Sequence, residues 1–231
     1  DGRRPWRGAG VAIPLFSIRS ADDWGCGDFK SLTLLGEWAA SVGMSVIQLL
    51  PINDTTASGS WRDSYPYNAI SSFALHPIYL DPRGAAKICD SVADASQKRK
   101  IVYRLKRYAT MAASLNELQS VDYEQVVKLK DDFLRELYRL CGAQVLKTAE
   151  YKEFFKQSRE WLLPYMVYCT LRERNHTVDF KSWPALSKFS ARKVSNFAKE
   201  NADEVGFYGF VQYLLDVELR EAREKLHRCG V

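Results

Sequence analysis

The chain has 231 residues, of which 46% are hydrophobic and 26% are charged, and its net charge is +5. This balance differs from the low-hydrophobicity, high-charge composition of disordered chains, so it predicts a folded protein with a sizeable core. Basic and acidic residues alternate along most of the chain, as in DDFLRELYR. Such alternation is typical of solvated helix faces and argues against a nucleic-acid-binding surface.

The five cysteines form an odd set without a CxxC pair. We therefore expect reduced, buried thiols in a cytosolic protein. No run of about 18 uncharged apolar residues occurs, and the N-terminus lacks the apolar core of a signal peptide, so we expect neither a membrane span nor secretion. Because the first residue is Asp1 instead of Met, we also expect the sequence to come from a longer polypeptide.

The first fifty residues predict one βαβ unit. Residues 9–17 (AGVAIPLFS) and 45–51 (SVIQLLP) are short apolar runs, which predict parallel strands buried on both faces. Residues 30–42 between them predict a helix that stops at Gly43. One face of that helix carries the apolar residues Leu32, Leu35, Trp38, Ala39 and Val42.

The rest of the chain predicts a long loop followed by helices. Residues 52–82 are rich in Asn, Asp, Ser, Thr, Gly, Pro and aromatics without a sustained period, and such long loops usually carry function. Apolar residues then recur at helical spacing in residues 122–141, 161–173 and 207–226, and Gly230 suits the position after the last helix. Because two parallel strands cannot cover both of their faces, the sequence predicts an incomplete α/β fold.

Three segments together resemble the opening of the catalytic barrel of the amylomaltase (disproportionating enzyme) family of 4-α-glucanotransferases. They are RGAGVAIPLFSIRS with DDWGCGDF, then VIQLLPIND, then DSYPYNAISSFALHPIYLD. The forms of these motifs are most similar to the cytosolic plant-type enzyme. The resemblance implies the first two strands of a (β/α)8 TIM barrel in residues 1–82, with their substrate-binding loop. It implies a large helical insertion in residues 83–231, leading to the third strand.

The resemblance also implies a reaction. Enzymes of this family cleave an α-1,4-glucosidic bond, hold the glucosyl unit as an ester on an Asp, and pass it to another sugar hydroxyl. Retaining chemistry of this kind needs two carboxyl groups about 5 to 5.5 Å apart. In the family these carboxylates come from strands beyond the second, so we assign no catalytic residue here, expect no cofactor or metal, and expect this segment alone to be inactive.

Several sugar-binding residues follow from the family's D-S-P-Y turn. The matching residues are Asp63, Ser64, Pro66 and Tyr67, with Tyr65 as one inserted residue, and Tyr67 is the preferred stacking ring. A pyranose presents C–H bonds on its face, so an aromatic ring can hold it while polar groups satisfy its hydroxyl edge. The same loop contains three further candidates for sugar contact: Asn53, Asp54 and Trp61.

Structural interpretations compete with these assignments. The DSYPY segment also fits an ordinary turn, and Asp22, Asp23 and Asp28 fit the cap of the first helix. His76 precedes a proline in an apolar stretch and is expected to be a packed loop residue. His176 and His227 lie at predicted helix ends and are expected to be solvated.

Three functions remain open from the sequence. The first is part of a cytosolic 4-α-glucanotransferase that binds an α-1,4-glucan or maltose and requires the rest of the barrel. The second is a non-catalytic glucan-binding or interaction protein made from a truncated barrel. The third is a purely structural helical domain. The sequence contains no HExxH, GxSxG or phosphate-binding glycine motif that would favour another enzyme class.

Overall fold

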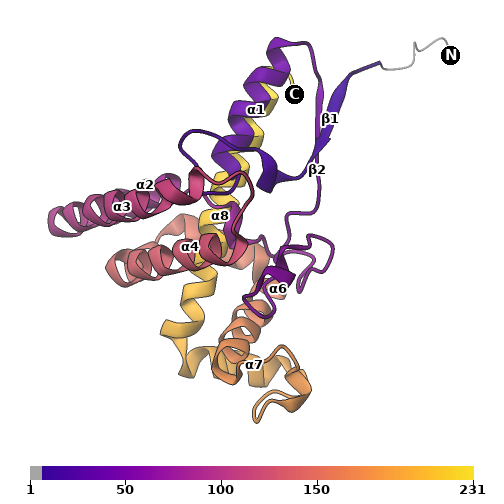
Figure 1. Ribbon diagram of the computed structural model, residues 1–231. Helices are drawn as coiled ribbons and strands as arrows, with labels where there is room; N and C mark the ends of the chain where they lie inside the picture. Colours follow the sequence, from indigo (N-terminus) through magenta and orange to yellow (C-terminus); the bar gives the residue numbers. More distant parts are fainter. Residues whose placement is uncertain (1–6) are drawn as a thin grey trace.

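The computed structural model describes residues 7–231, so Asp1 and the rest of the first six residues lie outside the described part. Strand β1 (Gly10–Ile13) pairs in parallel with β2 (Val46–Leu49), with Gly10 opposite Val46 and Ile13 opposite Leu49. Helix α1 (Phe29–Ser41) connects the two strands. The predicted βαβ unit is therefore confirmed, and it occupies one end of the molecule (Figure 1).

The ends of α1 follow from local chemistry. The Asp28 carboxylate accepts the Ser31 amide hydrogen at 2.7 Å, which satisfies one of the free N–H groups at the start of the helix. Past the C-terminus of the helix, Gly43 has φ +77°, a left-handed conformation that favours glycine. The capping interpretation is thus correct for Asp28. Asp23 instead pairs with Arg19 at 3.0 Å, and Asp22 pairs with Arg83 at 3.4 Å.

The expectation of two deeply buried strands is wrong for this chain. Both strands alternate between exposed and half-buried residues, and the helix between them is buried on only part of its expected apolar face. Leu32 and Ala39 are buried, whereas Trp38 and Val42 are 52% and 54% exposed. The physical reason is that the described residues form a sheet of only two strands, which leaves much of the apolar surface of the unit uncovered.

The helices after the loop form the larger part of the molecule. Residues 52–81, here called the β2 loop, lead into α2 (Pro82–Val92), α3 (Ala95–Asn116) and α4 (Tyr123–Leu137). A π-helical turn (Tyr138–Gly142) and the short α5 (Ala143–Val145) follow. The chain ends with α6 (Ala149–Asn175), α7 (Ala191–Glu200) and α8 (Ala202–Cys229). The three predicted helices are confirmed within α4, α6 and α8, and Gly230 adopts φ +88° after α8, as expected.

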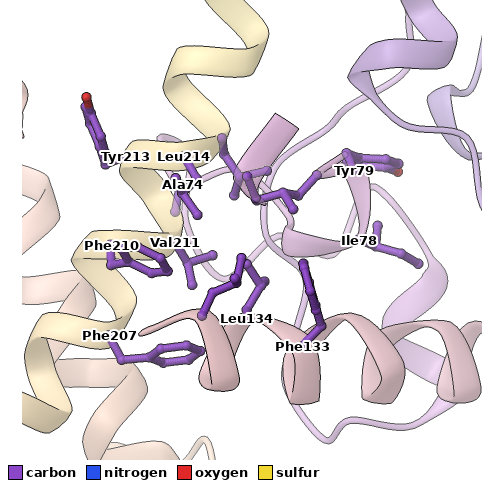
Figure 2. Close-up of a cluster of buried hydrophobic side chains, with 14 of the residues drawn as sticks. Ala74, Ile78, Tyr79, Phe133, Leu134, Phe207, Phe210, Val211, Tyr213 and Leu214 are labelled. Carbon is purple, nitrogen blue, oxygen red and sulfur yellow. The ribbon is translucent and has the colours of Figure 1, made fainter. Parts of the chain in front are cut away.

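One hydrophobic core joins the β2 loop to the helices. Figure 2 shows side chains of the loop, of α4 and of α8 that meet around a shared interior. Phe133 and Leu134 of α4 and Phe210 and Leu214 of α8 are at most 1% exposed. Ala74 of the loop is also fully buried, so the loop is packed as part of the core.

Helix α8 links the helical region to the βαβ unit. It runs the length of the molecule, and its C-terminal part lies along α1 (Figure 1). The two helices approach closely at Gly36, where an added Cβ would lie 2.7 Å from Leu226. Lys225 and Glu37 form an ion pair at 2.6 Å beside this contact. The division at residues 82 and 83 stays a prediction, and α8 packs against both of its parts.

The cysteine prediction is correct for four of the five thiols. Cys26, Cys89, Cys141 and Cys169 are buried and free, but Cys229 is exposed because it lies in the last turn of α8, beyond the packed part of the helix. Burial raises the pKa of the Cys26 and Cys169 thiols to about 12, which keeps them protonated. Within residues 7–231, no helix combines the length and apolarity needed to cross a membrane.

Glu218 gives the fold a testable pH dependence. Its Oε2 accepts the Asp81 amide hydrogen at 2.7 Å, and its Oε1 has no hydrogen-bond partner among the described residues. Burial, with the charges of Asp81 and Asp28, raises the pKa of this carboxyl well above its usual value. A carboxyl with a raised folded-state pKa costs stability as the pH rises above its unfolded-state pKa.

We therefore expect Glu218→Gln to have nearly the thermal midpoint of the native protein close to pH 4. The thermal midpoint of Glu218→Gln relative to the native protein should rise as the pH increases toward 8, because the amide, unlike the buried carboxyl, takes up no proton on folding. Thermal unfolding of the intact protein at several pH values measures this. Glu221→Gln, at an exposed position on the same helix, is the control and should show no such trend. A constant difference across pH would contradict the assignment.

Candidate functional site

The candidate site lies at the edge of the sheet where both strands end. Because β1 and β2 are parallel, their carboxyl ends meet at the same edge, and the segments that follow them come together there. A groove of about 650 Å³ lies between these segments and the connection from α3 to α4. Phe16 and Ser17 line it from the β1 side, and residues of the β2 loop line it from the other.

The structure brings five of the eight predicted residues to this groove: Asn53, Trp61, Asp63, Ser64 and Pro66. Asp54 lines a separate cavity of about 440 Å³ between the β2 loop and the helices α4, α6 and α8. Tyr65 and Tyr67 line neither cavity. Their rings are 61% and 59% exposed, with centroids 5.4 Å apart. Tyr67 therefore presents an open aromatic surface beside the groove, and its role in stacking stays a prediction.

Asp63 is a buried anion that shapes the loop around itself. Its Oδ2 accepts the backbone N–H groups of Ala57, Ser58 and Gly59 at 3.0, 2.8 and 2.7 Å. Gly59 contributes a positive φ of +71°, so the three consecutive N–H groups converge on one oxygen. The Thr55 hydroxyl also donates to the Asp63 carbonyl oxygen. Because most of its acceptor capacity is used inside the loop, Asp63 acts first as a positioning residue for the groove wall.

Asp54 is also buried and hydrogen bonded, but it connects the loop to helix α6. It is 1% exposed, and its carboxylate accepts the Tyr165 hydroxyl of α6 at 2.7 Å and the Thr56 amide at 2.9 Å. Arg172 of α6 donates to the Thr56 carbonyl oxygen. Burial and the Asp54 charge raise the pKa of the Tyr165 hydroxyl well above its usual value, so this group stays a donor. The loop is thus attached to α6 by a polar network.

The C-terminal part of the β2 loop is attached to α8. Gln212 accepts the Leu75 amide hydrogen and donates to the Leu75 carbonyl oxygen, both at 2.8 Å. Asn53 pairs with Leu75 in a single antiparallel bridge. These contacts satisfy backbone groups that a buried irregular segment would otherwise leave unpaired.

His76 is a packed loop residue, as expected from the sequence. Its Nδ1 accepts the Ile78 amide hydrogen at 3.1 Å, so the proton of the neutral ring lies on Nε2 and is donated to the Tyr123 hydroxyl at 2.8 Å. Burial lowers the pKa of this imidazole, which keeps it neutral. His176 and His227 are exposed, as expected.

Several residues of the groove were missed by the sequence interpretation. Phe16, Ser17 and Arg19 follow the end of β1, and the rule that parallel strands end at one edge could have found them. Residues 119–122 of the turn between α3 and α4 line the groove together with Tyr123 and Glu124 at the start of α4, and no local pattern indicates that position. Glu124 accepts the Trp61 amide hydrogen at 2.9 Å. Within residues 7–231 no cluster of three or more His, Cys, Asp or Glu side chains is arranged to hold a metal ion.

Three backbone N–H groups donate to the Asp63 carboxylate, so its removal should destabilise this part of the loop. Asp63→Ala removes the buried carboxylate on which three backbone N–H groups of the loop converge, and we expect a loss of about 1 to 3 kcal/mol in local stability, because hydrogen bonds to charged groups are stronger than neutral ones. Hydrogen exchange of the Ala57, Ser58 and Gly59 amides measures it. Asp63→Asn should retain most of the protection because an amide oxygen can accept the same bonds. Unchanged exchange in the alanine variant, relative to the exposed control Asp22→Asn, would contradict this role.

Comparison with known proteins shows which family this chain resembles. A family model described as 4-alpha-glucanotransferase matches residues 13–231. The rice 4-alpha-glucanotransferase DPE2 is 39% identical over 94% of this chain, which spans 22% of the rice protein. The 4-alpha-glucanotransferase of Chlamydia pneumoniae is 33% identical over 93% of this chain, which spans 38% of that protein. The chain thus covers well under half of these relatives.

Two solved structures share the fold. The amylomaltase of Streptococcus agalactiae, solved in complex with acarbose, superposes with a TM-score of 0.72 over 98% of this chain and 42% of its own, at 15% identity. The amylomaltase of Corynebacterium glutamicum gives a TM-score of 0.69 over 96% of this chain and 29% of its own, at 22% identity. Since the family model spans nearly the whole chain and the fold agrees, this chain belongs to the 4-α-glucanotransferase family.

Proposed function

We propose that this chain is the N-terminal part of the catalytic TIM barrel of a 4-α-glucanotransferase. In this proposal β1 and β2 are the first two barrel strands, and the catalytic carboxylates belong to the rest of the barrel. The whole protein transfers segments of α-1,4-glucan in maltose, maltodextrin or starch metabolism by a retaining double displacement. The chain supplies sugar-binding residues.

One observation carries the proposal: the groove lies at the carboxyl edge of the parallel strand pair, where barrel enzymes place their substrate. Its wall contains Asn53 and Ser64, whose polar groups suit sugar hydroxyls, and the open ring of Tyr67 stands beside it. The acarbose complex of the Streptococcus agalactiae amylomaltase also favours a sugar-like ligand for this fold.

The buried state of two loop carboxylates explains why this chain is proposed to bind sugar without performing the catalysis. Asp54 and Asp63 are buried and hydrogen bonded within the loop, so neither carboxylate is free to attack a sugar or to transfer a proton. A retaining mechanism needs a nucleophile and an acid/base group about 5 to 5.5 Å apart. In this proposal both roles fall to residues outside this chain. The proposed reaction requires no metal or cofactor, and the four buried free thiols are consistent with the cytosol as the proposed location.

The same engagement of Asp54 and Asp63 favours a second candidate, a glucan-binding protein without catalysis. Disproportionation of maltotriose separates the two. The intact protein that carries this chain should release glucose, whereas the 231-residue chain alone should release none. An intact protein that binds maltotriose but releases no glucose would favour the second candidate. An intact protein that neither binds nor converts it would leave a structural helical domain.

The stacking role of Tyr67 can be measured in the intact protein. Tyr67→Ala removes the proposed platform, and we expect the KM for maltotriose to rise about tenfold, since an aromatic contact contributes about 0.5 to 1.5 kcal/mol. Tyr67→Phe should restore the native value because the ring remains. Tyr65→Ala is the matched control, as its exposure is nearly equal. A larger effect at Tyr65 than at Tyr67 would reverse the assignment.

A further inference from the structure

Helix α3 carries the excess positive charge of the whole chain. The helix contains no Asp or Glu and six basic residues: Lys98, Arg99, Lys100, Arg104, Lys106 and Arg107. Since the net charge of the chain is +5, all other residues together carry −1 (+5 minus +6). Basic and acidic residues alternate elsewhere, so this helix is the one strongly basic element of the described residues.

The outward face of α3 is centred on Tyr103. Residues three and four positions apart are neighbours on a helix surface, so four cations surround this ring: Arg99, Lys100, Lys106 and Arg107. All four are exposed, and Tyr103 is 63% exposed. Helical periodicity places Arg99 and Lys106 on one side of the ring, and Lys100 and Arg107 on the other.

The four cations around Tyr103 have no carboxylate partner. The other two basic residues of the helix are paired. Lys98 lies 3.5 Å from Asp90, and Arg104 lies 2.6 Å from Glu136. Within residues 7–231 no ion pair involves the four cations of the outward face, so their charge acts on the surroundings of the molecule. A surface field of one sign attracts partners of the opposite sign.

The outward face is a convex ridge. The opposite side of α3 packs on α2 and α4 through Ile101, Tyr108, Ala112 and Leu115. In Figure 1 the helix projects from the side of the molecule, away from β1 and β2. No residue of α3 lines the groove or the cavity beside the β2 loop. Since small ligands bind in concave sites, this ridge suits a flat and extended anionic surface.

An anionic lipid bilayer matches the apolar part of this face as well as its charge. Tyr side chains favour the interface between headgroups and hydrocarbon, and Lys and Arg reach the headgroups while their stems cover apolar surface. Val102 and Met111, which are 63% and 49% exposed, lie on the flanks of the same face and add apolar contact with lipid. A nucleic acid would pair with the cations, but its phosphate backbone offers these aliphatic side chains no apolar partner.

We propose that α3 docks along the surface of an anionic bilayer, with Tyr103 at headgroup level and the four cations around it against the lipid headgroups. A basic helix with apolar residues on its exposed face is typical of proteins that lie on a membrane surface. The cytoplasmic leaflet is the anionic one, in keeping with the proposed cytosolic location. The inference goes beyond the proposed function and does not depend on it, because vesicle binding involves no glucan.

Flotation of the intact protein with vesicles tests this proposal. At about 0.1 M salt the protein should bind vesicles of about one third phosphatidylserine in phosphatidylcholine, and it should not bind pure phosphatidylcholine. Lys100→Gln combined with Lys106→Gln removes one cation from each side of Tyr103. We expect this double variant to bind about 30-fold more weakly, since each cation contributes about fivefold.

The matched control is Lys181→Gln combined with Lys188→Gln. Both lysines are exposed and lie outside α3, and the change in net charge is the same, so binding should stay native. Tyr103→Ala should weaken binding about fivefold without a change in charge, whereas Tyr103→Phe should retain it because the ring remains. The thermal midpoints of all variants should be native, because every substituted side chain is exposed.

Three results would overturn the proposal. The first is an intact protein that does not bind the phosphatidylserine vesicles, which would mean that other parts of the polypeptide cover α3. The second is equal binding by the two double variants, because overall charge would then be responsible. The third is binding to a DNA duplex, lost in the α3 double variant, without binding to vesicles. Vesicle binding by a protein that transfers no glucan would sustain this inference while the proposed function fails.

Discussion

The shape of the β2 loop depends on buried side chains that satisfy its backbone. A segment of this length without regular secondary structure has many N–H and C=O groups, and each one that is buried without a partner costs free energy. Asp63 collects three of these N–H groups on one oxygen, and Gln212 pairs with both backbone groups of Leu75. The loop wall of the groove includes Asp63 and so depends on this arrangement.

The helices that follow the β2 loop hold the loop in position. Tyr165 and Arg172 reach the loop from α6, Tyr123 and Glu124 reach it from α4, and Gln212 reaches it from α8. Since α8 also lies along α1, the same helix connects the site to the strand pair. The helices thus hold the loop of the candidate site in place beside the strand pair.

Charged and titratable groups in the interior are kept either paired or neutral. Lys130 is 1% exposed, and its ammonium group donates to the Ile78 and Leu80 carbonyl oxygens at the end of the loop. Burial lowers the pKa of His76 and raises the pKa of Glu218, which in each case favours the neutral form. Pairing and neutral forms avoid the large cost of an unpaired charge in a low-dielectric interior.

The sequence by itself determined the βαβ unit, the positions of α4 and of parts of α6 and α8, the helix cap at Asp28 and the loop that contains the candidate site. Those features arise from local periodicity, capping and turn chemistry, which act over a few residues. Only the tertiary structure decided that Asp54 and Asp63 are held inside the loop while Tyr65 and Tyr67 are exposed. It also decided that Phe73 stacks on Trp161, 88 residues away along the chain (161 − 73). Such contacts depend on how distant helices pack around the loop, and no short-range pattern in the sequence encodes that packing.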